Sequence, residues 1–388
     1  MVSLLSRIFI KNREDTDTPA VRQAYGILCG AVGIALNLLL FAGKFLAGYI
    51  SHSIAITADA FNNLSDAGSS IITLIGFKMA GQKPDPDHPF GHGRIEYVSG
   101  LMVSMLIFFM GYELLKSSVS KIIHPMELAY SPLVLVILVL SILVKCYMAL
   151  YNRRIGNKIH STAMKATALD SLSDTIATTV VLAATLISHF SGVTIDGYCG
   201  ILVALFIFYS GINAAKDTIS PLLGQAPDPE FVQSINDIVM SYEGVIGIHD
   251  LIVHNYGPGR VLISLHAEVP ADGDILSMHD MIDLIEHHLR DSLHCSAVIH
   301  MDPVCVGDEE TNRLKEETAV YLAEIDTTLT MHDFRIVKGP THTNIIFDIV
   351  VPYDFKMTDN EVVTALTERI RENNPNHFAV IEVDKKYS

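Results

Sequence analysis

Over its first 220 or so residues, the chain alternates long apolar runs with short polar breaks. Each run is close to the ~20 residues that an α-helix needs to cross a bilayer. The runs lie at roughly 24–50, 54–80, 98–122, 130–152, 164–190 and 196–220. Polar residues interrupt the second and the fifth run, so hydropathy alone ranks these two lowest. The pattern predicts a bundle of six membrane-spanning helices that forms one domain over residues 1–223.

The breaks between the runs differ in charge. Lys and Arg occur before the first run, between the second and third, and between the fourth and fifth. The alternate breaks, SHS, HPMELAYSP and HFSGVTIDG, contain neither residue. Positively charged loops stay on the cytoplasmic side of a membrane. We therefore expect both termini in the cytoplasm and the bundle in the plasma membrane.

After Gly224 the hydrophobic period changes. The segment QAPDPE is an acidic, proline-rich break, and shorter helix and strand patterns follow it. Helices are predicted at Glu230–Tyr242 and Ile275–Leu293, and strands at HDLIVHNY, RVLISLHAEV and SAVIHMD. The order αββαβ predicts a small two-layer α+β domain over residues 224–305.

The tail repeats this pattern. The segment MHDFRIVKGPTHTNIIFDIVVP from Met331 parallels IHDLIVHNYGPGRVLISLHAEVP from Ile248. The segment HFAVIEVD from His377 parallels CSAVIHMD from Cys295. Two matches in the same order predict a second, degenerate copy over residues 306–388. The alternative is a single domain followed by an unrelated tail.

Composition narrows the function classes. The chain has 388 residues, of which 49% are hydrophobic, and a net charge of −16. An acidic chain is a poor nucleic-acid binder but is compatible with collecting cations. The five cysteines are scattered without a CxxC pair, so the sequence predicts neither a disulfide framework nor a thiolate zinc site.

The two interrupted runs share one polar pattern. FNNLSDAGSS begins at Phe61 and LDSLSDTIAT at Leu169, and each contains Leu-Ser-Asp with an oxygen-bearing side chain four residues before the Asp. Positions i and i+4 lie on one helix face. Asn62 therefore shares a face with Asp66, and Asp170 shares one with Asp174.

An ionised carboxylate facing lipid is costly, so these side chains must face protein, water or a cation. If the second and fifth spans face each other, the four side chains form one ion site. The alternative is hydrogen bonding between helices through Asn and Ser. Asp59 lies near the same stripe, and its role stays open between an entry residue and none.

All four donors are oxygens. Zinc sites commonly use imidazole and thiolate, whereas carboxylate and amide oxygens suit harder ions such as Mn²⁺, Mg²⁺ or Ca²⁺. Metal ions and protons compete for the same carboxylates. We therefore expect the site to exchange a divalent ion for protons.

Two further clusters lie outside the predicted spans. The loop KPDPDHPFGHGRIEY contains Asp85, His88 and His92, which predict a metal site, the alternative being a polar turn with incidental histidines. In the first αββαβ unit, His300 and Asp302 share one strand face. His249, His266 and His279 are expected to converge with them on a third metal site.

The second copy changes these donors. Asp348 stands where His266 stands, and Glu382 where His300 stands, while His332, Asp333 and Asp384 match in kind. The copy keeps oxygen donors and loses imidazoles, which weakens the prediction of metal binding there.

The motifs FNNLSDAGSS, DHPFGHGRIEY, LDSLSDTIA, PLLGQAPDPE, IHDL and VIHMDP occur in this order. Over residues 20–305 the chain resembles the cation diffusion facilitator family of divalent-metal/proton antiporters. The resemblance implies six spans, cytosolic termini, a homodimer and a ferredoxin-like cytoplasmic domain that binds metal. Residue by residue, it implies a transport site of Asn62, Asp66, Asp170 and Asp174, a loop site of Asp85, His88 and His92, and a cytoplasmic site of His249, His266, His279, His300 and Asp302.

Zinc-transporting members usually place a His in the transport site, whereas this chain has Asn62 and Asp170 at the variable positions. The set resembles the manganese-exporting branch. We therefore expect a Mn²⁺ exporter that uses inward proton flow, with a Zn²⁺, Fe²⁺ or Cd²⁺ exporter as the alternative. A membrane-bound metal sensor without flux is a different class.

No enzyme is expected, since no nucleophile–base–orienter set is visible. No cofactor is expected beyond Mn²⁺ or Zn²⁺ as the transported and regulatory ion. The second copy departs from most members, and the sequence does not choose between a regulatory role and a dimer brace.

Overall fold

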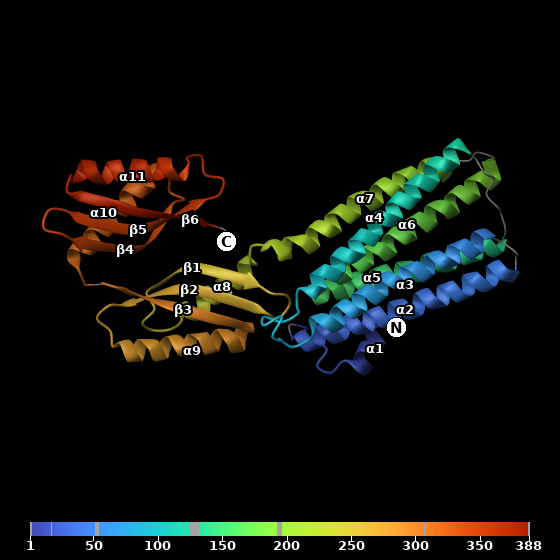
Figure 1. The fold of residues 1–388 in the computed structure, drawn as a ribbon, viewed down its shortest axis with the longest axis horizontal. Coiled ribbons are helices and arrows are strands. Elements are labelled where there is room, and N and C mark those ends of the chain that lie inside the picture. Colours follow the sequence, from blue (N-terminus) through green and yellow to red (C-terminus); the bar gives the residue numbers. More distant parts are fainter. Residues whose placement is uncertain are drawn as a thin grey trace. The chain divides into compact units, whose positions relative to one another are not determined.

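The computed structural model of the chain describes residues 2–16, 18–50, 54–124, 132–191, 196–305 and 307–386. The chain forms two compact units (Figure 1). The first comprises Met1–Gln225 with Asn255–Arg260, and the second comprises Ala226–His254 with Val261–Ser388.

The first unit is helical. A short helix, α1 (Val2–Phe9), precedes a series of long ones. These are α2 (Pro19–Ile50), α3 (Ile54–Ala80), α4 (Ile95–Ile123), α5 (Pro132–Lys158), α6 (Thr162–Ser191) and α7 (Asp196–Leu223). Each predicted apolar run therefore falls on one long helix.

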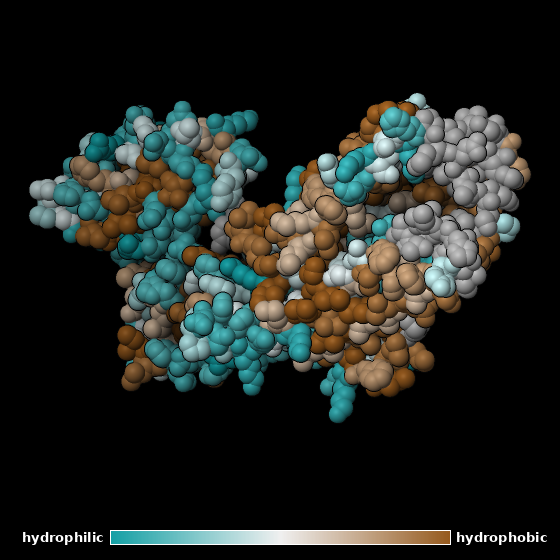
Figure 2. Space-filling model, turned by 45° about the vertical axis from the view of Figure 1, so that its right-hand side comes forward, coloured by the Kyte–Doolittle hydropathy of each residue, from teal (hydrophilic) through white to brown (hydrophobic). Residues whose placement is uncertain are grey.

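Among the described helices, four are long and apolar enough to cross a membrane. They are Pro19–Leu46, Ile95–Ile123, Leu135–Lys158 and Gly197–Leu223. The helices α3 and α6, which carry the Leu-Ser-Asp segments, are outside this set, as their polar residues predict. Figure 2 shows hydrophobic residues spread over much of the visible surface of the helical unit. Large apolar side chains such as Leu39, Leu143 and Leu202 are more than half exposed, which suits contact with lipid.

Small residues let α2 approach α3 closely. A Cβ atom added at Gly30 would lie 2.8 Å from Cβ of Leu74, and one added at Gly33 would lie 2.6 Å from Oγ of Ser70. Glycine at a helix interface permits such backbone approach in a membrane. The glycines of α2 therefore fix the position of α3, the helix that carries Asp66.

The helix α1 is a feature that the sequence patterns did not predict. Val2 and Ser6 are buried, and the backbone N–H of Val2 donates to the hydroxyl of Tyr147 at 3.1 Å. Val2 and Ile10 join the core that also contains Tyr25 and Phe77. Its eight residues are too few to stand out as an apolar run.

The second unit begins with the predicted αββαβ order. It contains α8 (Pro229–Met240), β1 (Gly247–Asn255), β2 (Val261–Pro270), α9 (Ile275–Leu293) and β3 (Cys295–Val304). The strands form one sheet in the order β1-β2-β3, with β2 and β3 parallel. Asp228 and Asp274 cap α8 and α9 by accepting backbone N–H groups. Ile235, Leu265 and Ile285 lie in the core between helices and sheet.

The same element order follows in the tail. It contains α10 (Glu309–Ile325), β4 (Thr330–Lys338), β5 (Thr343–Pro352), α11 (Asp359–Asn373) and β6 (His377–Lys386). The second sheet has the order β4-β5-β6, with β4 antiparallel and β6 parallel to β5. Its core, around Leu314, Phe347 and Leu366, is separate from the first. Each αββαβ unit thus buries its own apolar side chains.

Candidate metal sites

Two of the predicted membrane acids meet at one cation. Asp66 of α3 and Asp174 of α6 each place Oδ2 2.7 Å from Nζ of Lys145 on α5. The exposed fractions of the three side chains are 11%, 13% and 4%, respectively. Buried charges are tolerated only when they are paired in this way. The arrangement shows that the two carboxylates can close on a single positive charge.

Asp170 lies one turn before Asp174 and is buried. Its Oδ2 accepts a hydrogen bond of 2.7 Å from Oγ of Ser69 on α3. Its Oδ1 is buried without a hydrogen-bond partner among the described residues. Buried polar atoms are normally satisfied, so this oxygen is available to a ligand.

The asparagines of α3 differ in burial. Asn62, the predicted ligand, is exposed one turn before Asp66, whereas Asn63 is buried. The side chain of Asp59 lies outside the described part of the structure. The structure thus brings Asp66, Asp170 and Asp174 together at α3 and α6, and it leaves the predicted ligand Asn62 exposed.

The sequence reading missed Lys145. The residue is a lone lysine in the apolar segment LVLSILVKCYMAL of α5. A lysine in such a run needs an acidic partner, because an unpaired ammonium in hydrocarbon is costly. That rule, applied to α5, would have indicated that Lys145 has an acidic partner inside the bundle.

The loop after α3 brings its three predicted ligands together. Asp85 Oδ1 lies 3.5 Å from Nδ1 of His88, and its Oδ2 lies 3.3 Å from Nε2 of His92. Backbone N–H groups of Asp87 and His88 donate to Asp85 Oδ1. The bond from His88 is the main cause that holds the pKa of Asp85 below its usual range, and the nearby imidazoles add to it. The carboxylate is therefore ionised and preorganised beside two imidazoles.

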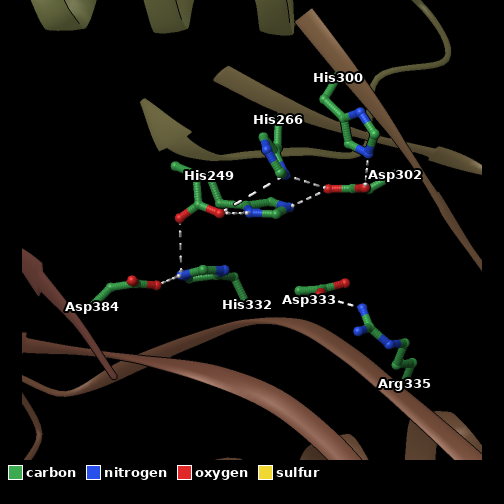
Figure 3. A network of polar contacts seen from close by, with 9 residues as sticks. His249, His266, His300, Asp302, His332, Asp333, Arg335 and Asp384 are labelled. Carbon is green, nitrogen blue, oxygen red and sulfur yellow. Dashed lines mark hydrogen bonds and ion pairs between the residues drawn. The ribbon is translucent and has the colours of Figure 1, made fainter. Parts of the chain in front are cut away.

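The first sheet brings together a second set of donors (Figure 3). Nδ1 of His266 lies 2.8 Å, and Nε2 of His249 lies 3.1 Å, from Oδ2 of Asp302. His300, the neighbour of His266 across β2 and β3, places Nε2 3.2 Å from Oδ1 of the same Asp302. The strands thus pair as the metal-site prediction requires. His249 Nε2 is buried without a hydrogen bond of good geometry to any described residue.

The structure does not bring His279 to this cluster. Its side chain, on α9, is 65% exposed and forms an ion pair of 3.6 Å with Asp283. Among the described residues it belongs to none of the groups with metal-ligand spacing. The helix α9 packs on the sheet through its apolar face, which leaves its polar face directed to solvent.

Asp250 joins the cluster, although the sequence reading did not include it. Its Oδ2 lies 3.3 Å from Nδ1 of His249 and 3.8 Å from Nδ1 of His266. Neighbouring residues of a strand normally point to opposite faces. Asp250, however, has a left-handed φ of 52°, which is uncommon for a residue other than glycine. The turned backbone places its carboxylate beside the imidazole of His249.

The second sheet holds a comparable group. His332, Asp348 and Asp384 offer donor atoms that all lie within 4.8 Å of one another. Burial raises the pKa of Asp348, and the nearby carboxylates of Asp333, Asp384 and Glu382 raise it further against the opposing effect of His332. The group therefore concentrates negative charge.

Known proteins were compared with the chain. The family profile of the cation efflux transmembrane domain matches residues 31–223, and that of the cation efflux protein cytoplasmic domain matches residues 227–304. The elements α10 to β6 lie beyond both matches.

Similar proteins have similar descriptions. An uncharacterized transporter, MJ0449 of Methanocaldococcus jannaschii, is 33% identical over 70% of this chain and 96% of its own length. The cation-efflux pump FieF of Escherichia fergusonii is 27% identical over 76% of this chain and 99% of its own length. FieF of Escherichia coli has the same identity and coverage. These matches confirm the family resemblance: the chain is a multi-pass membrane protein that belongs to the cation diffusion facilitator family of cation efflux transporters.

Proposed function

We propose that the protein exports a divalent metal ion, Mn²⁺ foremost, from the cytoplasm in exchange for protons. The observation that carries the proposal is the convergence of Asp66 and Asp174, from α3 and α6, on the ammonium of Lys145 at 2.7 Å each. Two carboxylates that close on one cation can close on another. A metal ion between α3 and α6 would replace the ammonium as their shared partner.

Exchange follows from competition for the same oxygens. A metal ion that enters must displace Nζ of Lys145 from Asp66 and Asp174, and the unpaired Oδ1 of Asp170 supplies a further donor. Protons that reach these carboxylates weaken their hold on the metal, because ligands bind metal in the deprotonated form. Metal and protons therefore occupy the site in turn.

The donor chemistry favours Mn²⁺ over Zn²⁺. The acids Asp66, Asp170 and Asp174 and the amide of Asn62 offer oxygen only, and such sets suit harder ions. The alternative is export of Zn²⁺, Fe²⁺ or Cd²⁺. It is favoured by the imidazoles of the cytoplasmic clusters, which are typical zinc ligands. The similar pumps are described only as cation-efflux pumps and do not decide the ion.

We also propose the membrane arrangement. All the long helices α2 to α7 cross the plasma membrane, α3 and α6 included, and both termini are cytoplasmic. The domains are 1–223, 224–305 and 306–388, the last being a degenerate tandem copy of the second. The matched cytoplasmic domain supports a homodimer, which light scattering of the purified protein would test.

Transport in proteoliposomes with a pH gradient tests the function. We expect Mn²⁺ flux that depends on the gradient and exceeds Zn²⁺ flux, and we expect Asp170→His to gain Zn²⁺ flux. A parent protein that prefers Zn²⁺ would refute the oxygen-donor argument. The variant Asp174→Asn tests the transport site. We expect it to lose metal efflux, and efflux equal to that of the parent would exclude the transport site proposed here.

A further inference from the structure

The tail unit places one donor on each of its three strands. His332 lies on β4, Asp348 on β5 and Asp384 on β6, and their donor atoms lie within 4.8 Å of one another. Nε2 of His332 is 3.1 Å from Oδ2 of Asp384. Asp348 is the direct neighbour of His332 across β4 and β5. Neighbouring strands thus converge their donors on one point, as a metal site requires.

This geometry repeats that of the first unit, in which His249, His266 and Asp302 come from β1, β2 and β3. In both units the first histidine precedes an aspartate with a left-handed φ, 52° at Asp250 and 49° at Asp333. The donor types differ. The first unit offers two imidazoles and one carboxylate, and the tail unit offers one imidazole and two carboxylates. The tail set therefore favours a harder ion.

The histidines of the two clusters have unsatisfied nitrogens. Nδ1 of His332 and Nε2 of His249 are buried and form no hydrogen bond of good geometry with any described residue, although Nε2 of His249 lies 3.1 Å from Oδ2 of Asp302. The side chain of His249 is 4% exposed and that of His332 is 14% exposed. Beside His332, the carboxylates of Asp348 and Asp384 place oxygen atoms within 4.8 Å of one another, so their negative charges repel. A cation bound in the first cluster would satisfy Nε2 of His249, and a cation bound beside Nε2 of His332 would offset this repulsion.

Asp250 lies between the clusters. Its Oδ2 is 3.3 Å from Nδ1 of His249, and its Oδ1 is 4.0 Å from Nε2 of His332. The rings of His249 and His332 stack with centroids 4.6 Å apart. Figure 3 shows the two imidazoles facing each other from the two sheets. One carboxylate oxygen is thus directed to each cluster.

We propose that the tail unit binds its own hard divalent ion, with Mn²⁺ as the probe, through His332, Asp348 and Asp384. Asp250 bridges this ion to a second one held by His249, His266 and Asp302. The pair of ions ties the two sheets together in one chain. The proposal concerns binding and does not depend on the transport reaction.

The first test counts bound ions. Purified full-length protein in detergent is titrated with Mn²⁺, and the free ion is measured by electron paramagnetic resonance. We expect Asp348→Asn/Asp384→Asn to bind one Mn²⁺ fewer than the parent, and Asp354→Asn, an exposed change in the same unit, to bind the parental number. A double variant that binds the parental number overturns the site.

Two further measurements complete the test. His332→Gln removes one donor only and keeps the test valid if the double variant fails to fold. We expect a loss of Mn²⁺ affinity of about tenfold or more, since removing even a residue that only orients a metal ligand costs about 10–100-fold. At low temperature the parent should show spin coupling between two Mn²⁺ ions, and Asp250→Asn should lose it. Coupling that persists in Asp250→Asn overturns the bridge. Because the readout is binding, a failed flux experiment leaves this result unaffected.

Discussion

Lys145 is a buried cation whose two partners are candidate ligands of the transported ion. We expect Lys145→Gln to lower the unfolding temperature in metal-free buffer, since breaking a buried ion pair costs about 3–5 kcal/mol. Added Mn²⁺ should then raise that temperature more than it does in the parent, because the ion no longer competes with the ammonium. Circular dichroism during heating measures both shifts.

The matched control is Lys158→Gln on the same helix, since Lys158 is 35% exposed and contacts Glu14 near the surface. This variant should respond to Mn²⁺ as the parent does. An equal Mn²⁺ shift in Lys145→Gln and Lys158→Gln would contradict competition at the acids.

Among single residues, the sequence predicted the membrane carboxylates but not the residues that contact the predicted ligands. Helical spacing placed Asp170 and Asp174 on one face, because that relation depends only on local geometry. The lone lysine in the apolar run of α5 indicates that Lys145 needs an acidic partner, but which acids it meets depends on how α5 packs against α3 and α6. Asp250 was missed for a different reason: strand alternation assigns it to the opposite face, and only its left-handed φ turns it toward His249.

The contact between α2 and α3, made at Gly30 and Gly33, sets the position of the helix that carries Asp66. We expect Gly30→Ala to destabilise the protein by about 1–3 kcal/mol, the usual cost of overpacking, because the new methyl group meets Cβ of Leu74. The shift of α3 should also lower metal flux. Gly43→Ala, on the same helix with open space around it, should leave both unchanged. If Gly30→Ala and Gly43→Ala have the same unfolding temperature and the same metal flux, the contact between α2 and α3 does not position α3.

The start of α11 depends on a titratable capping box. Glu361 accepts hydrogen bonds from the backbone N–H and the hydroxyl of Thr358, and these bonds hold the pKa of Glu361 below its usual range. A carboxylate with a lowered pKa in the folded state stabilises above its ordinary pKa and loses this effect as the pH falls through the lowered value.

We therefore expect Glu361→Ala to destabilise the tail unit at neutral pH, and the difference from the parent to shrink below about pH 4, near the ordinary glutamate pKa. Amide hydrogen exchange of α11 as a function of pH measures the effect. Glu368→Ala, an exposed change later in the helix, is the control. A Glu361→Ala difference that persists at low pH would assign the effect to something other than the carboxylate.

Long and strongly periodic elements were predictable. The bounds of α3 and α9 agree with the apolar runs and the amphipathic pattern, because both helices bury a continuous face. The helix α1 was not, since its eight residues depend on packing into a core that distant helices supply. The prediction for His279 failed for a related reason. The sequence placed His279 on a helix, but the apolar residues of α9 face the sheet, so His279 points away from the cluster.

At the scale of the whole molecule, the two αββαβ units have separate cores. Both matched family domains end by residue 304. We expect a chain ended after Cys305 to fold and to retain metal flux, while it loses the ion proposed for the tail unit. Flux assays together with Mn²⁺ counting test this. Loss of flux in the shortened chain would instead make the tail unit part of the transport machinery.

Lys145 also has an electrical consequence. When all three carboxylates are ionised, Asp66, Asp170 and Asp174 carry three negative charges, against the one positive charge of Lys145. One divalent ion, or two protons, would each cancel the remainder. Neither the loaded nor the returning carrier then moves net charge through the bilayer, so we expect Mn²⁺ flux to be indifferent to a potassium diffusion potential imposed with valinomycin. Flux that follows the sign of that potential would show that the lysine does not balance the site.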